Sequence, residues 1–445
     1  MQTTPETSTK KPAFCRSYLP RHRRDERGVT MILVALAMIA IIAMAALSID
    51  VVTLYLDREE AQRAADAAAL AAARVISVSG ITTNADPSND TAAWQSVCGT
   101  AGTATLIAQA VGSQNAVGGV ASSTPTITYS AQGSLPGVSD CSTLARAFAI
   151  NPTVIVQVQR TGLPTLFSRI WSRSSNTVSA TAMAEAFNPS DSETIDPGGQ
   201  NVPVVPRCVK PWIIPDIDPK AGGVLVHHHS GIIQNQSIKL NGGFPGIGEE
   251  FILTNACTGT TCSTPTQGQY VPAFISTSPV VAAPHCANGA NDDFQQAITG
   301  CDESTVYACG TVNGAQADMT TNRGSDISAA VQCITNIPTG NDTLDVTSYP
   351  FQIKAGTGNP IITNQAVTSS NSIMTLPIYD NGGSLTGNYP QVTILGFMQV
   401  FVNNVNSSGN MDVYILNVAG CGNGASSTLS APGTSPVPIR LITPQ

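Results

Sequence analysis

The sequence VTMILVALAMIAIIAMAALSI runs from Val29 to Ile49, and its only polar residues are Thr30 and Ser48. As an α-helix, a stretch of this length extends about 30 Å, which is the thickness of the hydrocarbon core of a bilayer. The stretch therefore predicts a single transmembrane helix. The residues expected to form the membrane anchor are Val29, Leu33, Leu36, Ile39, Ile42 and Leu47.

Charged residues flank this stretch unequally. Residues 1–28 carry seven Lys and Arg against three Asp and Glu, although the whole chain has a formal net charge of −8. The positive-inside rule therefore places residues 1–28 in the cytoplasm and the chain from Asp50 onward beyond the membrane. We expect this basic arm to contact anionic lipid headgroups. A nucleic-acid-binding arm is the less favoured alternative.

A cleaved secretory signal is the main competing interpretation of the N-terminus. Ala43-Met44-Ala45 has the small-x-small pattern that signal peptidase accepts. However, the 28 residues before the apolar stretch are long for a signal peptide, and the stretch continues past this site to a full spanning length. These two features favour a retained anchor.

The helical pattern continues beyond the membrane. Residues 50–77 contain neither Pro nor Gly and are rich in Ala, the best helix former. One uninterrupted helix is therefore predicted over residues 29–77. Small side chains at every fourth position let another backbone approach closely. The predicted helix-packing interface consists of Ala61, Ala65, Asp66, Ala69 and Ala73, and a solvated helix face is the alternative role for the Asp.

Three features together resemble the N-terminal region of the TadE/TadG-like Flp pilus-assembly family. They are Glu26-Arg27-Gly28 before the span, Asp50 just after it, and the sequence QRAADAAALAAA over residues 62–73. The resemblance covers roughly residues 24–76 and continues more weakly to residue 188. It implies a pilin-like plan, in which a membrane-anchored helix leads into a small sheet, and a role in a type IV-like pilus.

In the weaker continuation, strands are expected at residues 154–158 and 177–184, with a short helix at residues 165–171 between them. The implied partners are other pilus-assembly membrane proteins and pilin-like subunits. The implied location is the bacterial inner membrane, with a periplasmic or extracellular C-terminal region.

Two differences from the sequence motifs of related proteins limit the roles that this chain can have. A prepilin has Glu five residues after the Gly that precedes its apolar run, whereas this chain has Leu33 five residues after Gly28. A resident membrane component is therefore favoured over a filament subunit. The strings that begin at Asp140 and Asp326 lack the second Ser of a von Willebrand A-type metal site, so we expect no such site.

Cysteine usage agrees with export. Of 11 Cys, Cys15 lies in the basic arm and ten follow the span, an even number that allows five disulfides. Such bonds persist in an oxidising compartment. Zinc binding is less favoured, because no closely spaced C-x2-C pair is present. Cys98 and Cys141 are the candidate disulfide of the first region, and the remaining eight cannot be paired from the sequence.

The chain has the composition of an exported, loop-rich β protein, since only 11% of its residues are charged. In its C-terminal half this character is seen in the order of residues. Short apolar runs alternate there with turn residues. The expected strands are residues 223–226, 237–240, 251–254, 373–379, 391–402 and 411–418. The last two are expected to form a long hairpin, which makes the domain mainly antiparallel.

No arrangement of residues supports catalysis or a cofactor. His227-His228-His229 is the only concentration of metal-ligating side chains, and a polar loop or strand end explains it better than a metal site. The Gly-x-Ser-x-Gly, H-E-x-x-H and phosphate-binding glycine motifs are missing from the sequence. Trp212 is expected in the core of the second domain. We therefore expect no enzymatic activity, no nucleic-acid partner and no small-molecule substrate.

The predicted fold class is α+β. A single transmembrane helix continues into a long Ala-rich helix, followed by a small pilin-like α/β region and a mainly antiparallel β domain with disulfides. The expected segments are a basic arm (1–28), a transmembrane helix (29–49), a pilin-like region (50–188), a linker (189–206) and a β-rich domain (207–445).

Two functions remain open. The first is a non-enzymatic, membrane-anchored component of a Flp pilus-assembly or tight-adherence secretion apparatus. The second is a surface adhesin or minor pilin whose β domain binds a ligand. An exported hydrolase is a distant third, because the sequence does not place acids beside His285 or the His triplet.

Overall fold

The computed structural model describes the greater part of the chain. The described residues are 27–83, 91–121, 124–131, 133, 135–144, 148–149, 152–163, 167, 175–186, 204–226, 237–238, 246–274, 286, 292–301, 307–309, 315–359, 362–367, 369–382, 385–421, 431–433 and 437–442. The chain divides into two compact units. One comprises Met1–Tyr55 with Pro164–Ser175, and the other comprises Leu56–Leu163 with Asn176–Gln445.

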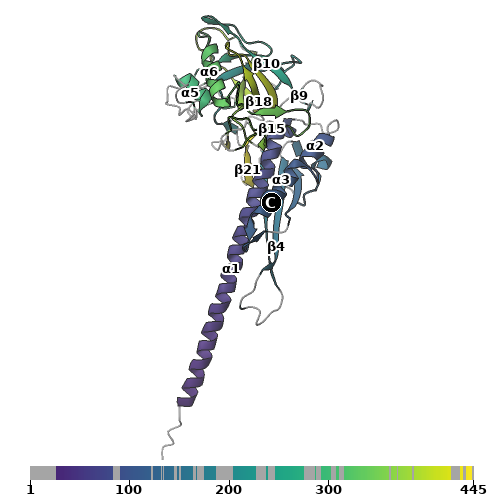
Figure 1. Cartoon of the computed structure of the whole chain (residues 1–445), viewed down its shortest axis with the longest axis vertical. Coiled ribbons are helices and arrows are strands. Elements are labelled where there is room, and N and C mark those ends of the chain that lie inside the picture. The colour runs from purple at the N-terminus through teal and green to yellow at the C-terminus, as the bar shows by residue number, and fades with distance from the viewer. Residues whose placement is uncertain are drawn as a thin grey trace, which may run out of the picture. The chain divides into compact units, whose positions relative to one another are not determined.

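A single helix, α1 (Arg27–Ser79), runs for 53 residues and contributes to both units (Figure 1). Its length follows from the composition, because Ala and Leu dominate and no Pro or Gly interrupts it after Gly28. It ends at Gly80, whose φ of +81° lies in the left-handed region that stops helices. The long uninterrupted helix expected from the sequence is confirmed.

A four-stranded antiparallel sheet follows α1 in the second unit. Its order is β21-β5-β4-β3. These strands are β3 (Thr126–Ala131), β4 (Pro152–Leu163), β5 (Asn176–Ala186) and β21 (Ile439–Ile442). The strands expected at residues 154–158 and 177–184 lie inside β4 and β5. The edge strand β21, from the far end of the chain, was not among the strands expected from the sequence.

A buried ion pair accompanies the edge strand β21. The Arg440 guanidinium donates to the carboxylate of Glu185, which is fully buried on β5. Burial raises the pKa of Glu185, and the charge and hydrogen bond of Arg440 oppose this rise. The pair therefore links the C-terminal strand to the sheet by a contact across 255 residues.

Two helices, α2 (Thr91–Cys98) and α3 (Thr103–Gln114), precede the sheet along the chain. Trp94, Phe148 and Tyr129 form a buried aromatic cluster there, with ring centroids 5.9 and 6.0 Å apart. The Tyr129 hydroxyl and the Thr105 hydroxyl are hydrogen-bonded at 2.7 Å. The apolar cluster with one satisfied polar group forms the core of this region.

The C-terminal half contains a closed six-stranded barrel in the order β10-β13-β7-β17-β18-β19 (Figure 1). Its strands are β7 (Trp212–Pro215), β10 (Glu250–Asn255), β13 (Gln269–Pro272), β17 (Ile373–Tyr379), β18 (Ile394–Val405) and β19 (Met411–Gly420). Four of its six ladders are antiparallel, and β10–β13 and β7–β17 are parallel. The mainly antiparallel fold class is confirmed. Closure of the barrel and its two parallel pairs were not expected.

The expected terminal hairpin is present as β18 and β19, paired from Gly396 with Gly420 to Val405 with Met411. Trp212 is fully buried in β7, as expected. The strand predicted at residues 223–226 is wrong. There the N–H groups of Leu225 and Val226 donate to the buried Asp216 carboxylate at 3.1 and 2.7 Å, and of these four residues Val226 alone belongs to a β-bridge.

The remaining elements are short. They are η1 (Ile81–Thr83), η3 (Cys141–Leu144), α5 (Asp293–Thr299), α6 (Gly324–Thr335), the sheet of β14 (Thr343–Asp345), β15 (Gln352–Lys354) and β16 (Ala366–Val367), and the pairs β1 (Ala116–Val117) with β2 (Val120–Ala121), β6 (Val204–Pro206) with β20 (Ala431–Gly433), β8 (Ser237–Ile238) with β9 (Gly246–Ile247), and β11 (Cys257–Thr258) with β12 (Thr261–Cys262). The pair β6 and β20 again brings the end of the chain back toward its middle.

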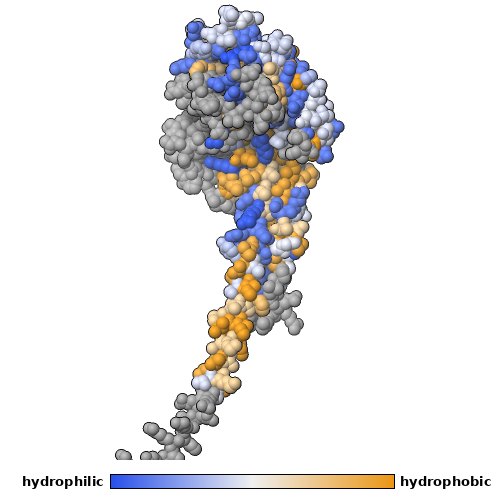
Figure 2. All heavy atoms as spheres, turned by 60° about the vertical axis from the view of Figure 1, so that its left-hand side comes forward, coloured by the Kyte–Doolittle hydropathy of each residue, from blue (hydrophilic) through white to orange (hydrophobic). Residues whose placement is uncertain are grey.

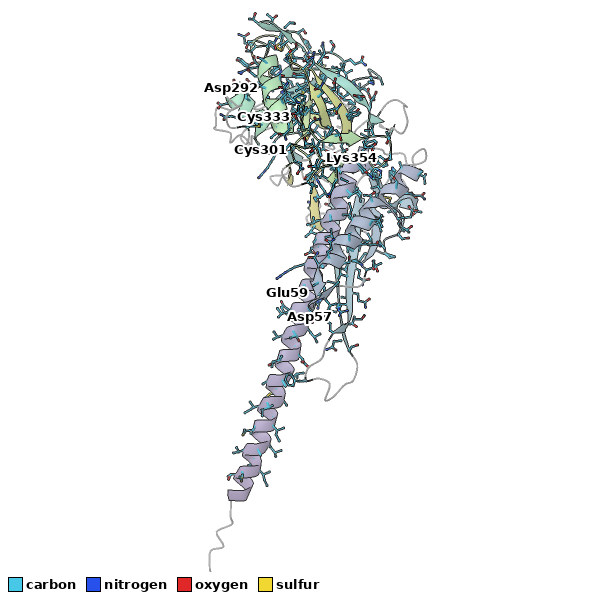
Figure 3. The ribbon with its side chains drawn as sticks, in the orientation of Figure 1. Asp57, Glu59, Asp292, Cys301, Cys333 and Lys354 are labelled. Carbon is cyan, nitrogen blue, oxygen red and sulfur yellow. A yellow bond between two sulfur atoms is a disulfide. The ribbon has the colours of Figure 1, made fainter. Side chains whose placement is uncertain are left out.

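All ten cysteines that follow the span form disulfides. The pairs are Cys98–Cys141, Cys208–Cys301, Cys257–Cys262, Cys286–Cys333 and Cys309–Cys421. The first is the pair that the sequence singles out, and the other four had no assignment. Two of them close loops of 93 and 112 residues; Figure 3 labels Cys301 and Cys333. Within the described residues, no group of His, Cys, Asp and Glu side chains could hold a metal ion.

Candidate functional site

The first part of the candidate site is the apolar run of α1. The described helix is long and apolar enough to cross a membrane, and none of its most apolar window is buried. Figure 2 shows apolar residues covering this run of the helix. The side chains of Leu33, Leu36, Ile39, Ile42 and Leu47 are all exposed. The side chain of Val29 lies outside the described set. Burial in a protein core therefore does not account for this apolar surface.

Asp50, directly after the apolar run, makes a contact within the first unit. Its side chain is 4% exposed, although its neighbours Ile49 and Val51 are exposed. The backbone N–H of Phe167 donates to its Oδ2 at 3.0 Å and to its Oδ1 at 3.3 Å. The acid in the family-like motif is thus bound by a residue 117 positions away. The short helix expected at residues 165–171 lies outside the described residues, apart from Phe167.

The second part of the site is the alanine face of α1. Ala61, Ala65, Ala69 and Ala73 are fully buried within the second unit. The Nε2 of Gln62 donates to Asp66 at 2.8 Å and, more weakly, to the Thr181 carbonyl of β5 at 3.4 Å.

Elements of the same chain supply the close packing on this side of α1. A Cβ at Gly112 of α3 would lie 3.4 Å from the Cβ of Ala68, so the backbones approach closely because both residues are small. The small side chains thus serve the fold of this chain.

Acidic residues lie on the first turns of α1 in the second unit. Glu60 accepts a hydrogen bond from the N–H of Gly118 at 2.9 Å. Burial and the nearby charge of Glu60 raise the pKa of Asp57, and the charge of Arg160 on β4 partly opposes them. Glu59 and Arg63 form an exposed i,i+4 pair at 3.6 Å, which contributes little to stability. Figure 3 labels Asp57 and Glu59 on the helix.

The C-terminal end of α1 is held by the barrel and its neighbouring loop. The last four carbonyls of a helix have no partner within it. Here the Ser79 hydroxyl donates to the Ile76 carbonyl at 2.7 Å, and the Asn417 amide of β19 donates to the Ser77 carbonyl at 2.8 Å. The Tyr349 hydroxyl donates to the Ser79 carbonyl. We call Asn417 and Tyr349 the helix-end clamp.

The helix-end clamp is buried and closely packed. Asn417 is fully buried, and its Oδ1 lies 3.5 Å from the Thr82 hydroxyl. A Cβ on Gly80 would lie 2.5 Å from Ile247 Cγ2, so only glycine fits where the helix ends. Sequence analysis alone could not find this contact, because its partners are 340 and 270 residues apart.

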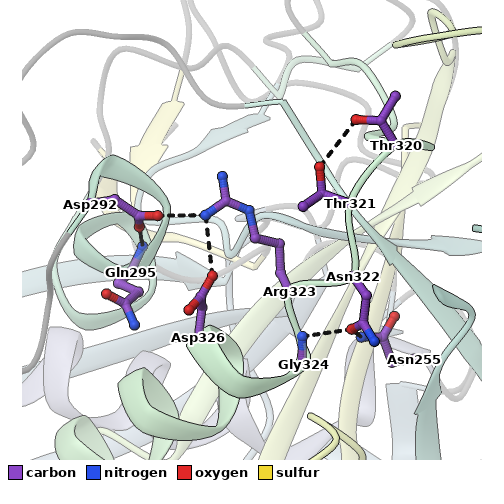
Figure 4. A network of polar contacts seen from close by, with 9 residues as sticks. All are labelled: Asn255, Asp292, Gln295, Thr320, Thr321, Asn322, Arg323, Gly324 and Asp326. Carbon is purple, nitrogen blue, oxygen red and sulfur yellow. Dashed lines mark hydrogen bonds and ion pairs between the residues drawn. The ribbon is translucent and has the colours of Figure 1, made fainter. Parts of the chain in front are cut away.

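A cavity of about 250 Å³ lies beside α5 and the start of α6. Its lining consists of Ala273, Phe274, Asp292, Asp293, Phe294, Asp318, Arg323 and Tyr389. The Arg323 guanidinium donates to Asp292 and, at 3.2 Å, to Asp326 (Figure 4). It also lies 5.0 Å from the centre of the Phe294 ring. The Oδ1 of Asp318 accepts from the backbone and hydroxyl of Thr320 at 2.9 and 2.6 Å.

These contacts explain the charges around the cavity. The ion pairs of Arg323 join the N-terminus of α5 to the first turn of α6, and Asp292 also caps α5 by accepting from the Gln295 N–H at 2.9 Å. Asp292, Asp318 and Arg323 therefore have structural partners, and the described lining of this cavity contains no Ser, Cys or His side chain. His227, His228, His229 and His285 lie outside the described residues.

Comparison with known families bears on α1 alone. Residues 28–75 match the Tad family model, described as Putative Flp pilus-assembly TadE/G-like. This match confirms the resemblance seen in the sequence for that segment, and it supports involvement in Flp pilus assembly. It ends before the sheets begin, so the weaker resemblance up to residue 188 lies outside it. No curated protein and no solved structure matches the chain.

Proposed function

We propose that this chain is a single-pass, non-enzymatic membrane component of a Flp pilus-assembly or tight-adherence secretion apparatus. The observation that carries the proposal is the coincidence of the matched segment, residues 28–75, with the exposed apolar helix α1. A helix that belongs to a pilus-assembly family and leaves its apolar residues uncovered is suited to a lipid environment.

The proposed orientation has residues 1–28 in the cytoplasm and the folded part periplasmic or extracellular, with the inner membrane as location. Two features support it. The arm carries the excess of basic residues. The ten cysteines after the span form five disulfides, which persist on the oxidising side of the membrane.

The proposed partners are other pilus-assembly membrane proteins and pilin-like subunits. Because Ala61, Ala65, Ala69 and Ala73 are buried within this chain, contacts with other helices are proposed to involve the apolar run of α1. A non-enzymatic role agrees with the ion pairs that occupy the charged groups around the described cavity.

The segment limits expected from the sequence (1–28, 29–49, 50–188, 189–206 and 207–445) are retained as a proposal with one addition. Strands β20 and β21 return from the end of the chain to pair with β6 and β5. The last segment therefore contributes to the first sheet.

The testing experiment combines intact mass and membrane fractionation of the native protein carrying a C-terminal tag. A full-length mass in the inner membrane fraction is expected. Loss of the residues up to Gly28 would instead indicate prepilin-type processing and a minor pilin. Cleavage after Ala45 would release a soluble exported protein and refute the anchor.

Orientation can be tested through Cys15. The ten cysteines after the span form five disulfides, so Cys15, the eleventh cysteine of the sequence, is the position chosen for labelling with a membrane-impermeant maleimide. Labelling is expected only after the inner membrane is permeabilised. Labelling in spheroplasts with an intact inner membrane would contradict the orientation, and a Cys15→Ser variant controls for labelling at other positions.

A further inference from the structure

The cavity beside α5 and α6 has a backbone frame on one side. Residues 315–318 lie between residues 272–274 and 390–392, and backbone hydrogen bonds of 2.5–3.2 Å join them to both segments. Phe274, in one flanking segment, and Tyr389, next to the other, are therefore positioned by the same frame. Both side chains line the cavity.

These two aromatic rings leave much of their surface uncovered. The rings of Phe274 and Tyr389 meet edge to face, with centroids 5.8 Å apart, and each side chain is 41% exposed. In contrast, Trp212, Tyr270 and Tyr379 of the barrel strands are fully buried. Tyr389 also has a φ of +57°, a left-handed conformation that bulky residues rarely adopt. The fold thus keeps two rings where a ligand can pack against them.

The guanidinium of Arg323 uses one of its three nitrogens for its ion pairs. Asp292 and Asp326 both accept from Nη1 (Figure 4). Neither Nε nor Nη2 has a hydrogen-bond acceptor among the described residues, and Nε is buried. A buried donor without an acceptor is costly, and Nε–H and Nη2–H together form an edge that suits the oxygens of one ligand.

Two acids in the lining have acceptor oxygens left over. Asp318 is 7% exposed, and both hydrogen bonds from Thr320 go to its Oδ1. Its Oδ2 has no donor in the part of the chain that the structure describes. The carboxylate of Asp293, in the first turn of α5, makes no hydrogen bond or ion pair with any described residue. A carboxylate accepts up to about four hydrogen bonds, so both groups can accept more.

These groups together indicate the chemistry of a ligand. The carboxylates require hydrogen-bond donors, the second edge of Arg323 requires acceptors, and the exposed rings require an apolar face. Asp293 and Asp318 would repel an anion, and a cation would leave the guanidinium edge without an acceptor. A sugar ring has hydroxyls that both donate and accept, and its C–H face packs against aromatic rings. The volume of about 250 Å³ is just below the range of about 300–1,000 Å³ for drug-sized ligands, so it suits a single ring.

We infer that this cavity binds a neutral sugar residue of a glycan. The rings of Phe274 and Tyr389 pack against the C–H face of the sugar. Asp293 and Asp318 accept from its hydroxyls, and the second edge of Arg323 donates to its hydroxyl oxygens. The site goes beyond the proposed assembly role and does not require the membrane anchor, and the family match, which ends at residue 75, assigns no ligand to this part of the chain.

The test measures binding of the detergent-solubilised full chain to an array of immobilised oligosaccharides. The array carries neutral hexose and N-acetylhexosamine chains, with sialylated and uronic acid chains as anionic comparators and oligolysine as the cationic comparator. The chain is expected to bind one or more of the neutral oligosaccharides and to bind the charged comparators more weakly. Binding is expected to be equal at about 0.05 and 0.5 M salt, because salt screens only interactions between charges.

The variants remove exposed or half-buried side chains of the cavity. Tyr389→Ala and Phe274→Ala each remove one ring and are expected to weaken binding about tenfold. Asp293→Ala removes a charged acceptor and is expected to weaken binding by about tenfold or more. The matched control is Ile252→Ala, because Ile252 of β10 is 62% exposed and does not line the cavity, and it should bind like the native chain. Urea unfolding followed by the fluorescence of the buried Trp212 verifies that each variant is folded.

Three outcomes would overturn the sugar site. The first is a native chain that binds none of the neutral oligosaccharides. The second is equal binding by the native chain and the three cavity variants, because the glycan is then held elsewhere. The third is a preference for oligolysine that fades with salt and is lost in Asp293→Ala, which indicates a basic peptide as the ligand. All three leave the membrane anchor untouched, since membrane fractionation tests it separately.

Discussion

Substituting Ala for Asn417 should destabilise the folded part of the chain by releasing the end of α1 from the barrel. Asn417 is fully buried on β19, and its amide donates to the Ser77 carbonyl at 2.8 Å. Ala cannot replace this donor. The Ser77 carbonyl is one of the four that a helix leaves unbonded at its C-terminus.

The expected cost follows from the burial of the carbonyl. A buried acceptor that loses its only donor costs about 1–3 kcal/mol, which is more than the net gain from an ordinary hydrogen bond. Removal of the amide also leaves a small void that the fully packed site cannot readily fill. The contact from Oδ1 to the Thr82 hydroxyl, at 3.5 Å, adds little. We expect the free energy of unfolding to fall by about 2 kcal/mol.

The assay is urea unfolding of the detergent-solubilised full chain, followed by tryptophan fluorescence. Trp94 reports on the region of α2 and Trp212 on the barrel, and both are fully buried. The matched control is Asn404→Ala, because Asn404 is exposed on the adjacent strand β18. The control is expected to change stability by less than about 0.5 kcal/mol.

A loss of stability in Asn417→Ala no larger than in the control would refute the clamp as a stabilising contact. Tyr349→Phe gives an independent check, because it removes only the hydroxyl that donates to the Ser79 carbonyl. If both variants unfold like the native chain, the end of α1 is not held by the barrel in solution.

Three further outcomes are expected from urea unfolding. Gly80→Ala should lower the free energy of unfolding by about 1–2 kcal/mol because of its left-handed backbone, and by more because the new Cβ would clash with Ile247 of β9. The control is Gly162→Ala, because Gly162 has a φ of +74° and open space around it, so this variant measures the effect of the backbone alone. Burial lowers the pKa of Lys210 from 10.5 to about 8. The unfolded chain therefore binds more protons between these values, so stability should rise by about 3 kcal/mol from pH 8 to 10.5, and Lys210→Met should lack this rise. Arg440→Met should cost about 3–5 kcal/mol at neutral pH, because it leaves Glu185 buried without its partner. That cost should shrink as the pH falls and Glu185 becomes protonated, and an unchanged cost would exclude a buried charge as its cause.

The sequence predicted those elements of the fold whose structure depends mainly on residues close together in the chain. The helix over residues 29–77 follows from Ala and Leu content and from the missing Pro and Gly, and α1 confirms it. The hairpin of β18 and β19 follows from two apolar runs separated by turn residues. Prediction failed at residues 223–226, where two backbone N–H groups donate to the Asp216 carboxylate. The periodicity of apolar residues does not show that a carboxylate nine or ten residues away accepts from these backbone N–H groups.

The candidate site likewise has features that the sequence predicts and features that only the structure shows. Composition marks the apolar run of α1 and the alanine face, but it does not say what covers that face. The structure covers it with elements of the same chain. The partner of Asp50 was likewise hidden, because Phe167 acts through its backbone N–H, a group that every residue except Pro possesses.

The sequence by itself determined the apolar helix, the basic arm, the match of residues 28–75 to a family model and the even number of cysteines after the span. These properties depend on composition and on spacings of a few residues. Only the tertiary structure decided the disulfide pairs beyond Cys98–Cys141, the closure of the barrel, the return of β21 to β5 and the clamp on the end of α1. Each of these joins residues that are far apart along the chain. Such contacts form because the whole fold buries their side chains together. Local propensity does not determine which distant segments will meet.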